Sequence, residues 1–562
     1  MAHTFEPLLD DDSSGVIAGI EVAKQIMAMG TPEYSLRLIF TMEFYGFAAF
    51  HANFHGKAIG GANMDSLPTR KNEYCKMTPP ISSVPFHGVE VFKQIAAEFK
   101  DILPCVLAEP ECFDDMSLSD STTGIPTVWF LKRVDESKHV KLWHNSAQTE
   151  PGFMNPETLA DFTALETVWF CKTLFYTGAP AELPELELKP VSSPWRDYAE
   201  QQVFARAQTG LPYDLTRVPK AQRIPLPDDV IYGPMSSLLS GMDGCKDMAQ
   251  IILETEADRR IAFTDHQIRK YLDAINYLAD WGYLTAIRRN ELTGEMLRTA
   301  LTGLGIAQGD VLLVHSSVSK CGYVNGGAQT IIKAVMDVVG QEGAALFPAF
   351  TMPYIYLGET LNRSWNYRPY DPSDPSQIWT GMVPRVLLEK FPNAKLSRHV
   401  THSWAGLGQK AEACLSEHGP LDPPTSSNSP LGKALEMDGK VIYLGTGLEP
   451  STFLHLIETV NHASYLQSAV CRVKKPDGTL RTVLIEEHLP GHRDFYRDDA
   501  ENSKFFRRAV QEGLKIEEAS FGMGKLQLIG LRNFYEVAMK LWKEDPRILL
   551  CDNPDCQFCS RF

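Results

Sequence analysis

The chain contains 562 residues, with 54 Lys and Arg against 70 Asp and Glu, so its formal charge at pH 7 is −16. This length exceeds what a single core of ~150 residues fills, which predicts several domains. The acidic balance argues against a non-specific nucleic-acid binder, because such a protein needs a basic surface.

The sequence also indicates where the protein works. No stretch reaches the ~18 apolar residues of a membrane-spanning helix, and the longest candidate, 344–357, is broken by Pro348 and Pro353. The first residues carry no basic and apolar leader pattern. Most of the 11 cysteines are scattered, which is typical of free thiols in a reducing compartment. We therefore expect a cytoplasmic protein with no membrane and no nucleic-acid partner.

Two changes in composition suggest domain boundaries. Residues 179–192 are rich in Pro and Glu and are expected to form a linker. Residues 286–295 are charged and precede a helix start at Thr293, with Glu295 in the first turn. A multidomain α/β protein is predicted, with three segments: 1–180, 190–288 and 292–562.

The first segment mixes helices and strands. Its predicted elements are a helix over 14–29, a buried strand over 35–41, a strand over 127–131 and a helix over 156–174. The last of these helices is expected to present a polar face with Thr158, Asp161 and Glu166.

The second segment is predicted to be mostly helical. A helix opens at Asp265, carries apolar residues at helical spacing, and ends at Trp281 and Gly282. A short helix over 246–255 and a strand over 283–285 complete a pattern that resembles a winged-helix module. The acidic chain favours a packing or dimerisation unit over a DNA-binding one, and a homodimer is kept open.

The third segment contains a β-α-β pattern. The apolar run 310–315 predicts a buried parallel strand, a Gly326-Gly327 turn leads into a helix over 330–339, and a strand follows at 344–348. Ligands of open α/β sheets bind at the carboxyl ends of such strands. A later buried strand, 439–445, runs into a second helix.

That second helix carries His455 and Glu458. Their spacing of three places them on one helical face, within reach of each other. A His held by a carboxylate keeps one tautomer and gains basicity, which suits a general base. Ser451 or Thr452 is expected to cap the helix. A purely structural His–Glu pair is the alternative, and on spacing alone it is favoured.

His399 and His402 also lie three residues apart. Two histidines at this spacing can ligate a metal, but no third ligand accompanies them. They are therefore interpreted as residues that line a site or support the fold.

Seven short motifs in the third segment occur in a recognisable order. They are VHSS at 314–317, GGA at 326–328, FPAFT at 347–351, THS at 401–403, NSPL at 428–431, DGKVIYLG at 438–445 and TFLHLIE at 452–458. Together they strongly resemble the aminoglycoside 3-N-acetyltransferase family, over about 293–545.

The resemblance implies transfer of an acetyl group from the co-substrate acetyl-CoA to an amine of an aminoglycoside or similar amino-sugar, and hence antibiotic resistance. It assigns the general base to His455, with Glu458 as its partner. It assigns the acyl-CoA site to the strand end and the double-glycine turn, that is, to His315, Ser316, Ser317, Gly326 and Gly327.

The chain departs from this family at three places. Glu449 stands where members often have Asp, Val400 stands where they often have Pro, and Leu396 stands where an Arg is expected, with Arg398 nearby. Arg398 is therefore assigned to CoA binding. His402 and Glu449 are assigned to substrate binding.

The first segment contains DDDSSG at 10–15, MEFYG at 42–46, NMD at 63–65 and WHNS at 143–146. This order resembles that of co-catalytic zinc aminopeptidases. The matching metal positions are Asp11, Glu43, Asp65 and His144. Phe44 replaces the second glutamate of the family's Glu-Glu pair, and Phe5 stands where the first metal His is aligned. An inactive module is therefore expected, while a zinc-dependent hydrolase with an accessory acyltransferase domain remains an alternative. An N-acyltransferase of a natural-product pathway and a scaffold without catalysis are further alternatives.

The end of the chain contains three closely spaced cysteines. Cys551, Cys556 and Cys559 provide three of the four ligands that structural zinc needs. A fourth ligand would come from elsewhere in the chain or from a second chain. Free thiols are the alternative interpretation, so zinc is one of two hypotheses for this motif.

Overall fold

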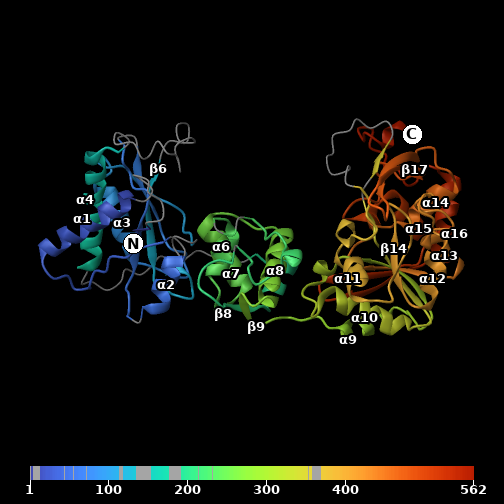
Figure 1. Ribbon diagram of the computed structural model, residues 1–562, viewed down its shortest axis with the longest axis horizontal. Coiled ribbons are helices and arrows are strands. Elements are labelled where there is room, and N and C mark those ends of the chain that lie inside the picture. The colour runs from blue at the N-terminus through green and yellow to red at the C-terminus, as the bar shows by residue number, and fades with distance from the viewer. Residues whose placement is uncertain are drawn as a thin grey trace. The chain divides into compact units, whose positions relative to one another are not determined.

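The fold is described from a computed structural model that divides into two units, Met1–Asn290 and Glu291–Phe562 (Figure 1). The structure describes residues 2–3, 13–42, 45–54, 56–70, 73–112, 118–133, 154–175, 191–212, 214–228, 230, 232–351, 354–356 and 369–562. None of the helices in these ranges combines the length and hydropathy that crossing a bilayer requires.

A four-stranded mixed sheet organises the first part of the N-terminal unit. Its order is β3-β6-β4-β5, formed by Gly61–Met64, Thr127–Arg133, Tyr74–Thr78 and Cys105–Leu107. A separate parallel pair joins β1 (Ala2–His3) to β2 (Phe40–Thr41). Alternate apolar residues of β3, β4 and β6 enter one core, as expected for strands with one buried face.

Three helices supply the other side of that core. They are α1 (Ser13–Met29), α3 (Gly88–Glu98) and α4 (Pro156–Leu174), and a shorter helix, α2 (Tyr45–Asn53), precedes β3. The Asn155 side chain caps α4 by accepting hydrogen bonds from two first-turn N–H groups. The helices expected over 14–29 and 156–174 and the strand expected over 127–131 are confirmed.

Two expectations for this region are wrong. The run 35–41 forms a strand only at Phe40–Thr41 and is largely exposed, because its only partner in the described chain is the two-residue β1. The polar face expected on α4 is also partly buried. Glu166 is fully buried where α4 packs on the sheet, and burial raises its pKa well above the usual range.

The remainder of the N-terminal unit combines a small sheet with short helices. Three antiparallel strands are ordered β8-β7-β9, formed by Asp243–Asp247, Val203–Arg206 and Leu284–Arg288. The helices are α5 (Pro194–Ala199), α6 (Pro234–Ser240), α7 (Met248–Arg259) and α8 (Asp265–Asp280). The helix expected from Asp265 is confirmed, with a capping box at Thr264 and Gln267.

A buried ion pair connects the two parts of the N-terminal unit. Arg206 Nη1 lies 2.5 Å from Asp120 Oδ2, and the two side chains are 1% and 2% exposed. The second Asp120 oxygen accepts a hydrogen bond from the Thr122 N–H. The pair therefore ties β7 to the loop that precedes β6.

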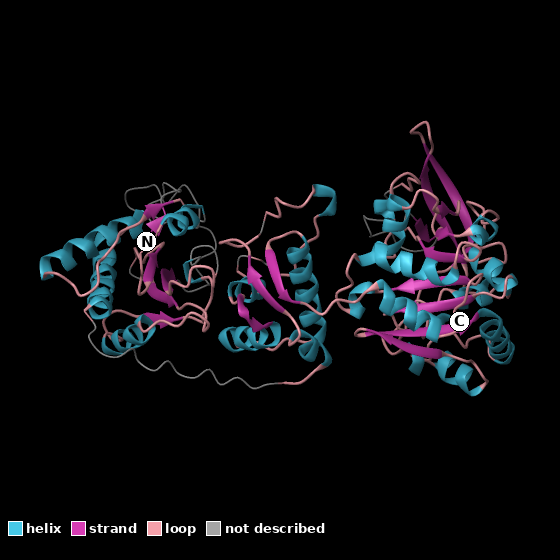
Figure 2. Ribbon diagram, turned by 90° about the horizontal axis from the view of Figure 1, so that it is seen from below, coloured by secondary structure: helices cyan, strands magenta, loops and turns pink. Residues whose placement is uncertain are grey.

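The C-terminal unit is built on a seven-stranded sheet with helices on both faces (Figure 2). The strand order is β13-β14-β11-β10-β15-β19-β18, from Lys395–Leu396, Trp404–Leu407, Ala344–Pro348, Val311–Ser316, Lys440–Leu444, Gly524–Gly530 and Glu517–Phe521. The central strand β10 pairs in parallel with both β11 and β15. These three strands are those expected from the apolar runs.

Successive residues of the central strands enter opposite cores. Val311 and Leu313 of β10 belong to one cluster, whereas Leu312 and Val314 belong to the other. The first cluster includes helices α12 (Gln409–Leu415), α13 (Pro430–Glu436), α14 (Phe453–Val460), α15 (Lys504–Gln511) and α16 (Leu531–Glu544). The second includes α9 (Gly294–Gly303), α10 (Gly327–Val339) and α11 (Met382–Lys390). The unit is thus a three-layer α/β/α structure.

A second, smaller sheet belongs to the same unit. It has the order β12-β16-β17, formed by Tyr354–Tyr356, Gln467–Lys474 and Leu480–His488. Strand β16 follows α14 directly, and β17 leads into the loop 489–499. This hairpin therefore returns the chain to the vicinity of α14.

We expect Asp120→Asn to lower the free energy of unfolding of the N-terminal unit by about 3–5 kcal/mol, because it leaves the buried Arg206 guanidinium without its counter-charge. Urea denaturation of the full chain measures the change. Glu109→Gln is the matched control, since the Arg260–Glu109 pair is exposed (80% and 44%) and should contribute less than about 1 kcal/mol. If the two substitutions lowered the free energy of unfolding equally, the buried Asp120–Arg206 pair would contribute no more to stability than the exposed one.

Candidate active site

The candidate site lies where the carboxyl ends of β10 and β15 meet. These strands pair in parallel register, with His315 opposite Tyr443 and Ser316 opposite Leu444. Strand β15 then continues through a loop into α14, which carries His455. The parallel topology therefore brings the two predicted motifs to one edge of the sheet, as expected for ligand sites of α/β folds.

His455 and Glu458 contact each other on α14, as their spacing predicts. His455 Nδ1 lies 2.7 Å from Glu458 Oε2, and the two side chains are 5% and 0% exposed. The expected helix cap is absent, because neither Ser451 nor Thr452 bonds to a first-turn N–H. Ser451 Oγ instead donates to the Leu448 carbonyl at 2.5 Å.

Glu458 is held by more partners than the sequence suggests. Arg493 Nε donates to its Oε1 at 2.5 Å and Arg493 Nη2 to its Oε2 at 3.2 Å, while the Tyr465 hydroxyl donates at 3.0 Å. Burial by itself would raise the pKa of Glu458, but the Arg493 guanidinium and His455 outweigh it and lower the pKa to about 2. The carboxylate therefore stays ionised throughout the physiological pH range.

The other nitrogen of His455 faces a more accessible region. The Tyr496 hydroxyl lies 2.7 Å from His455 Nε2, and Tyr496 is 42% exposed. Because Nδ1 is occupied by Glu458, Nε2 is the nitrogen available for proton exchange with a ligand. The tautomer with its proton on Nδ1 satisfies the Glu458 contact and leaves Nε2 as an acceptor.

Arg493, Tyr465 and Tyr496 were not found by sequence reasoning. Arg493 and Tyr496 lie on the loop 489–499, far along the chain from α14, and nothing in their local pattern distinguishes them from surface residues. The Arg493 guanidinium is fully buried and lies over the Tyr465 ring at 4.8 Å. A charged side chain buried in this way requires a partner, which the fold supplies through Glu458.

His315 is a supporting residue in this geometry. Its Nε2 lies 3.1 Å from Thr452 Oγ1, and its ring stacks on Tyr443 with centroids 5.5 Å apart. Burial lowers the pKa of His315 to about 3, so it is neutral. These contacts fasten the end of β10 to the start of α14, and its expected role in cofactor binding stays a prediction.

The other residues expected to bind acyl-CoA lie beyond the end of β10. Ser316 and Ser317 are partly exposed. Gly326 and Gly327 have φ values of +76° and +55°, which glycine adopts at little cost. No side chain caps α10 at Gly326, so this helix presents first-turn N–H groups that can bind an anion.

Arg398 and Glu449 have partners within the protein. The exposed Arg398 donates to the Ser416 carbonyl at 3.1 Å. Glu449 accepts a hydrogen bond from Thr446 Oγ1 at 2.7 Å and lies 3.6 Å from Lys320 Nζ. Glu449 thus lies between the loop after β10 and the loop after β15, and the ligand roles of both residues stay predictions.

A cluster of buried histidines lies near His402. The rings of His399 and His418 stack with centroids 4.6 Å apart, and His402 meets His488 edge-on at 5.0 Å. Thr401 Oγ1 lies within hydrogen-bond distance of His402 Nδ1 (2.8 Å) and His488 Nε2 (3.2 Å). Burial, followed by the neighbouring histidines including His455, lowers the pKa of His402 well below its usual range.

One of the four positions matched to aminopeptidase metal ligands lies in the described part of the chain. Asp11, Glu43 and His144 lie outside the described residues. Asp65 is buried, and its Oδ2 accepts a hydrogen bond from the Trp129 indole at 3.0 Å. One of the four expected ligands is therefore described, and it is engaged with the β3–β6 sheet.

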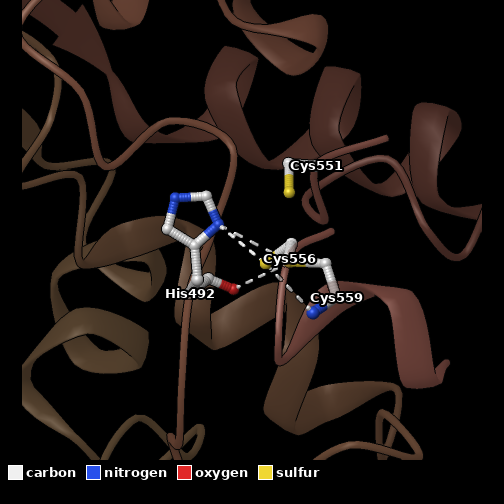
Figure 3. A group of neighbouring side chains, drawn as sticks. All are labelled: His492, Cys551, Cys556 and Cys559. Atoms are coloured by element: carbon white, nitrogen blue, oxygen red, sulfur yellow. Dashed lines mark hydrogen bonds between the residues drawn. The ribbon is translucent and has the colours of Figure 1, made fainter. Parts of the chain in front are cut away.

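The three cysteines near the end of the chain do converge, and a histidine joins them (Figure 3). The ligand atoms of His492, Cys551, Cys556 and Cys559 all lie within 4.8 Å of one another. Hydrogen bonds from the Cys559 and Phe558 N–H groups lower the pKa of Cys556 to about 7. His492 was missed in the sequence, because it lies on the loop 489–499, far from the cysteines.

Comparisons with known proteins concern mainly the C-terminal unit. The family described as aminoglycoside 3-N-acetyltransferase matches residues 313–543. Aminoglycoside N(3)-acetyltransferase IX of Micromonospora chalcea is 32% identical over 260 residues, which cover 43% of this chain and 88% of the relative. Aminoglycoside N(3)-acetyltransferase IV of Salmonella sp is 29% identical over 264 residues, covering 47% and 90%. The solved structure of aminoglycoside acetyltransferase AAC(3)-IVa covers 48% of this chain and 96% of its own at 27% identity, with a TM-score of 0.39.

The buried histidines predict acid sensitivity of the C-terminal unit. Burial lowers the pKa values of His315, His399, His418 and His488 to between about 2 and about 4. Below pH ~6.5 the unfolded chain binds more protons at these histidines than the folded chain does. Their contribution to the free energy of unfolding is therefore fully present above that pH. It falls by about 1.4 kcal/mol per pH unit for each histidine as the pH drops toward the pKa values of the folded protein.

Urea denaturation of the full chain at pH 7.5, 6 and 5, followed by proteolysis at sites in residues 291–562, measures this loss. His418→Asn should make the dependence on pH shallower, since it removes one of the four proton-binding groups. A midpoint for the C-terminal unit that does not change between pH 7.5 and 5 would contradict the neutral state of these residues.

Proposed function

The chain belongs to the aminoglycoside 3-N-acetyltransferase family, and on that premise we propose that its C-terminal unit transfers an acetyl group from acetyl-CoA to an amine of an aminoglycoside or similar amino-sugar. Modification of such an antibiotic would make the protein a resistance enzyme. The observation that carries the proposal is the environment of His455, whose Nδ1 is held by a buried carboxylate while Nε2 faces the partly exposed Tyr496.

His455 acts as the general base in this proposal. An ammonium group has no lone pair for attack on a thioester, so the amine must lose a proton before or during attack. The incoming amine takes the place of the Tyr496 hydroxyl beside His455 Nε2 and transfers its proton there. The resulting imidazolium is stabilised by Glu458, which is ionised and buried within hydrogen-bond distance.

The reaction then balances without an additional reactant. The amine nitrogen forms a bond to the thioester carbonyl carbon, which gives a tetrahedral oxyanion. When this intermediate collapses, the C–S bond breaks and the CoA sulfur leaves, and the proton held by His455 neutralises the thiolate. The nitrogen of an acceptor that enters as an ammonium loses a second proton, which passes to solvent. The products are therefore an acetylated amine, free CoA and one proton, and His455 returns to its neutral form.

We place the acetyl-CoA co-substrate at the carboxyl end of β10 and the start of α10. Gly326 and Gly327 leave the backbone open, since no Cβ restricts approach, and α10 lacks a side-chain cap. A pyrophosphate is an anion, which the positive end of a helix and its unpaired N–H groups bind. The exposed Arg398 is the cationic side chain that would bind CoA at this site.

The acidic character of the protein suits a polycationic acceptor. The formal charge of −16 attracts cationic ligands over a distance set by ionic strength. Near the site, Glu449 accepts a hydrogen bond from the Thr446 hydroxyl, and its carboxylate adds a negative charge that attracts an ammonium group. His402, which is neutral and partly exposed, forms another wall of the proposed acceptor site.

For the N-terminal unit we propose binding or assembly and no catalysis. Residues 1–180 would be an aminopeptidase-like module and 190–288 a winged-helix-like module. Phe44 lacks any atom that ligates a metal or accepts a proton, and Asp65 already bonds to the Trp129 indole. A cytoplasmic location, in which cysteines stay reduced, and assembly as a homodimer complete the proposal.

We expect His455→Ala to lower the rate of acetyl transfer by about 10²–10⁴-fold, because general-base assistance is lost. The assay follows release of the CoA thiol with acetyl-CoA and a series of aminoglycosides. His462→Ala is the matched control, since this histidine is also paired with a glutamate (2.5 Å to Glu487) but is 77% exposed. A His455→Ala enzyme that keeps more than a tenth of the wild-type rate would remove His455 from the mechanism.

Acetyl-CoA should slow amide hydrogen exchange at residues 326–332, where the first turn of α10 would bind the pyrophosphate. The first turn of α9 serves as an internal control, because the Thr293 side chain already accepts a hydrogen bond from the Met296 N–H. Exchange there should be unchanged when acetyl-CoA is added. Protection confined to residues 1–180 would place acetyl-CoA in the N-terminal unit and contradict the proposed co-substrate site.

A further inference from the structure

The cluster of His492, Cys551, Cys556 and Cys559 has the composition of a structural zinc site. Three of its ligand atoms are sulfurs and one is a ring nitrogen, which is the Cys3His set common among structural zinc sites. Figure 3 shows the His492 ring nitrogen and the sulfurs of Cys551 and Cys556 turned toward one another. Borderline-soft divalent ions prefer such a set, whereas magnesium and calcium prefer oxygen ligands.

Two of the distances between these atoms match those around a tetrahedral ion. His492 Nδ1 lies 3.6 Å from Cys559 Sγ and 3.8 Å from Cys556 Sγ. Bond lengths of about 2.1 Å for Zn–N and about 2.3 Å for Zn–S place tetrahedral ligand atoms about 3.5–3.8 Å apart. Cys551 and Cys559 are buried, so the sulfurs are shielded from solvent on one side.

We propose that these four residues bind one zinc ion, and that the ion fixes the loop 489–499 so that Arg493 and Tyr496 reach His455 and Glu458. The three cysteines lie beyond residue 543, where the family match ends. The site would therefore connect the end of the chain to the acyltransfer machinery. Its effect on catalysis rests on the function proposed above, whereas metal binding does not.

The connection to the active site begins with adjacent residues of the loop. His492 is a ligand, and the next residue, Arg493, bonds to Glu458 through two nitrogens. Tyr496 lies on the same loop and contacts His455 Nε2. A change in the position of His492 would therefore move both side chains that contact the proposed catalytic pair.

The end of the chain also packs directly on this loop. The Phe558 ring lies 5.5 Å from the Arg493 guanidinium, and a Cβ added at Gly491 would collide with that ring. The Asp494 N–H donates to the Leu549 carbonyl at 2.9 Å. An ion that joins Cys559 to His492 would hold these contacts together, since metal binding stabilises the folded arrangement of its ligands.

The first test measures metal content and needs no enzymatic activity. We expect the untagged full-length chain, purified without chelator, to contain one zinc ion per chain when it is measured by inductively coupled plasma mass spectrometry. Cobalt(II) added to metal-stripped, reduced chain should give the thiolate charge-transfer and tetrahedral ligand-field bands. Cys551→Ser and His492→Gln should lose the metal or change these bands, whereas the matched controls Cys414→Ser and His462→Gln should not.

The second test concerns the loop. Removal of zinc from the wild-type chain under reducing conditions should speed amide exchange at residues 489–499, and added zinc should restore it. Acetyl transfer should fall by about 10²-fold in kcat, as expected for misplaced catalytic groups, with KM for acetyl-CoA changed by less than about 3-fold. This split distinguishes a positioning ion from one that binds substrate.

Each result has a single meaning. A chain that is free of metal, fails to bind cobalt, or forms a disulfide between two of the cysteines overturns the zinc site and leaves the acetyltransferase proposal intact. Metal binding with no change at residues 489–499 overturns the positioning role. Metal binding and loop ordering without acetyl transfer support the site and contradict the proposed function.

Discussion

The burial of one carboxylate is the constraint on which the active region depends. Glu458 is fully buried, and an isolated charge in such a place would be strongly unfavourable. Arg493 compensates the charge with two hydrogen bonds, and His455 and Tyr465 occupy the remaining lone pairs. Because the partners come from different parts of the chain, α14, the segment between α14 and β16 that carries Tyr465, and the loop 489–499 must all be in place before Glu458 is stabilised.

The parallel core of the sheet makes this convergence possible. β10 and β15 end at the same edge, and the His315–Thr452 contact joins the first strand to the helix that follows the second. The hairpin of β16 and β17 then returns the chain to α14, where the loop closes over His455. A base with one nitrogen anchored and one accessible follows from this topology, since Nδ1 faces the core and Nε2 faces the loop.

Local patterns in the sequence were sufficient for part of this arrangement. Apolar runs predicted the central strands, and a spacing of three predicted that His455 meets Glu458. Partners that are distant in the chain were not predictable in the same way. Arg493 and Tyr496 lie in a loop whose sequence has neither helical nor strand periodicity. A single arginine in a polar loop is usually solvated. The prediction that Glu166 lies on an exposed polar face was wrong for a different reason. Helical spacing does not distinguish a polar residue on the surface from one that is buried against a sheet.

The proposed zinc site at the end of the chain was also predicted only in part, because one of its residues is distant in the sequence. The spacing of the terminal cysteines indicated three ligands, but only the fold brings His492 to them. A zinc ion bound by three thiolates and a neutral imidazole carries a net charge of −1, and Arg493 lies next to it in the chain. Arg493 would then face two negative groups, the zinc site and Glu458. The local charge would be −1 before proton transfer and zero afterwards, so the environment would favour the imidazolium form of His455 that forms as the amine attacks.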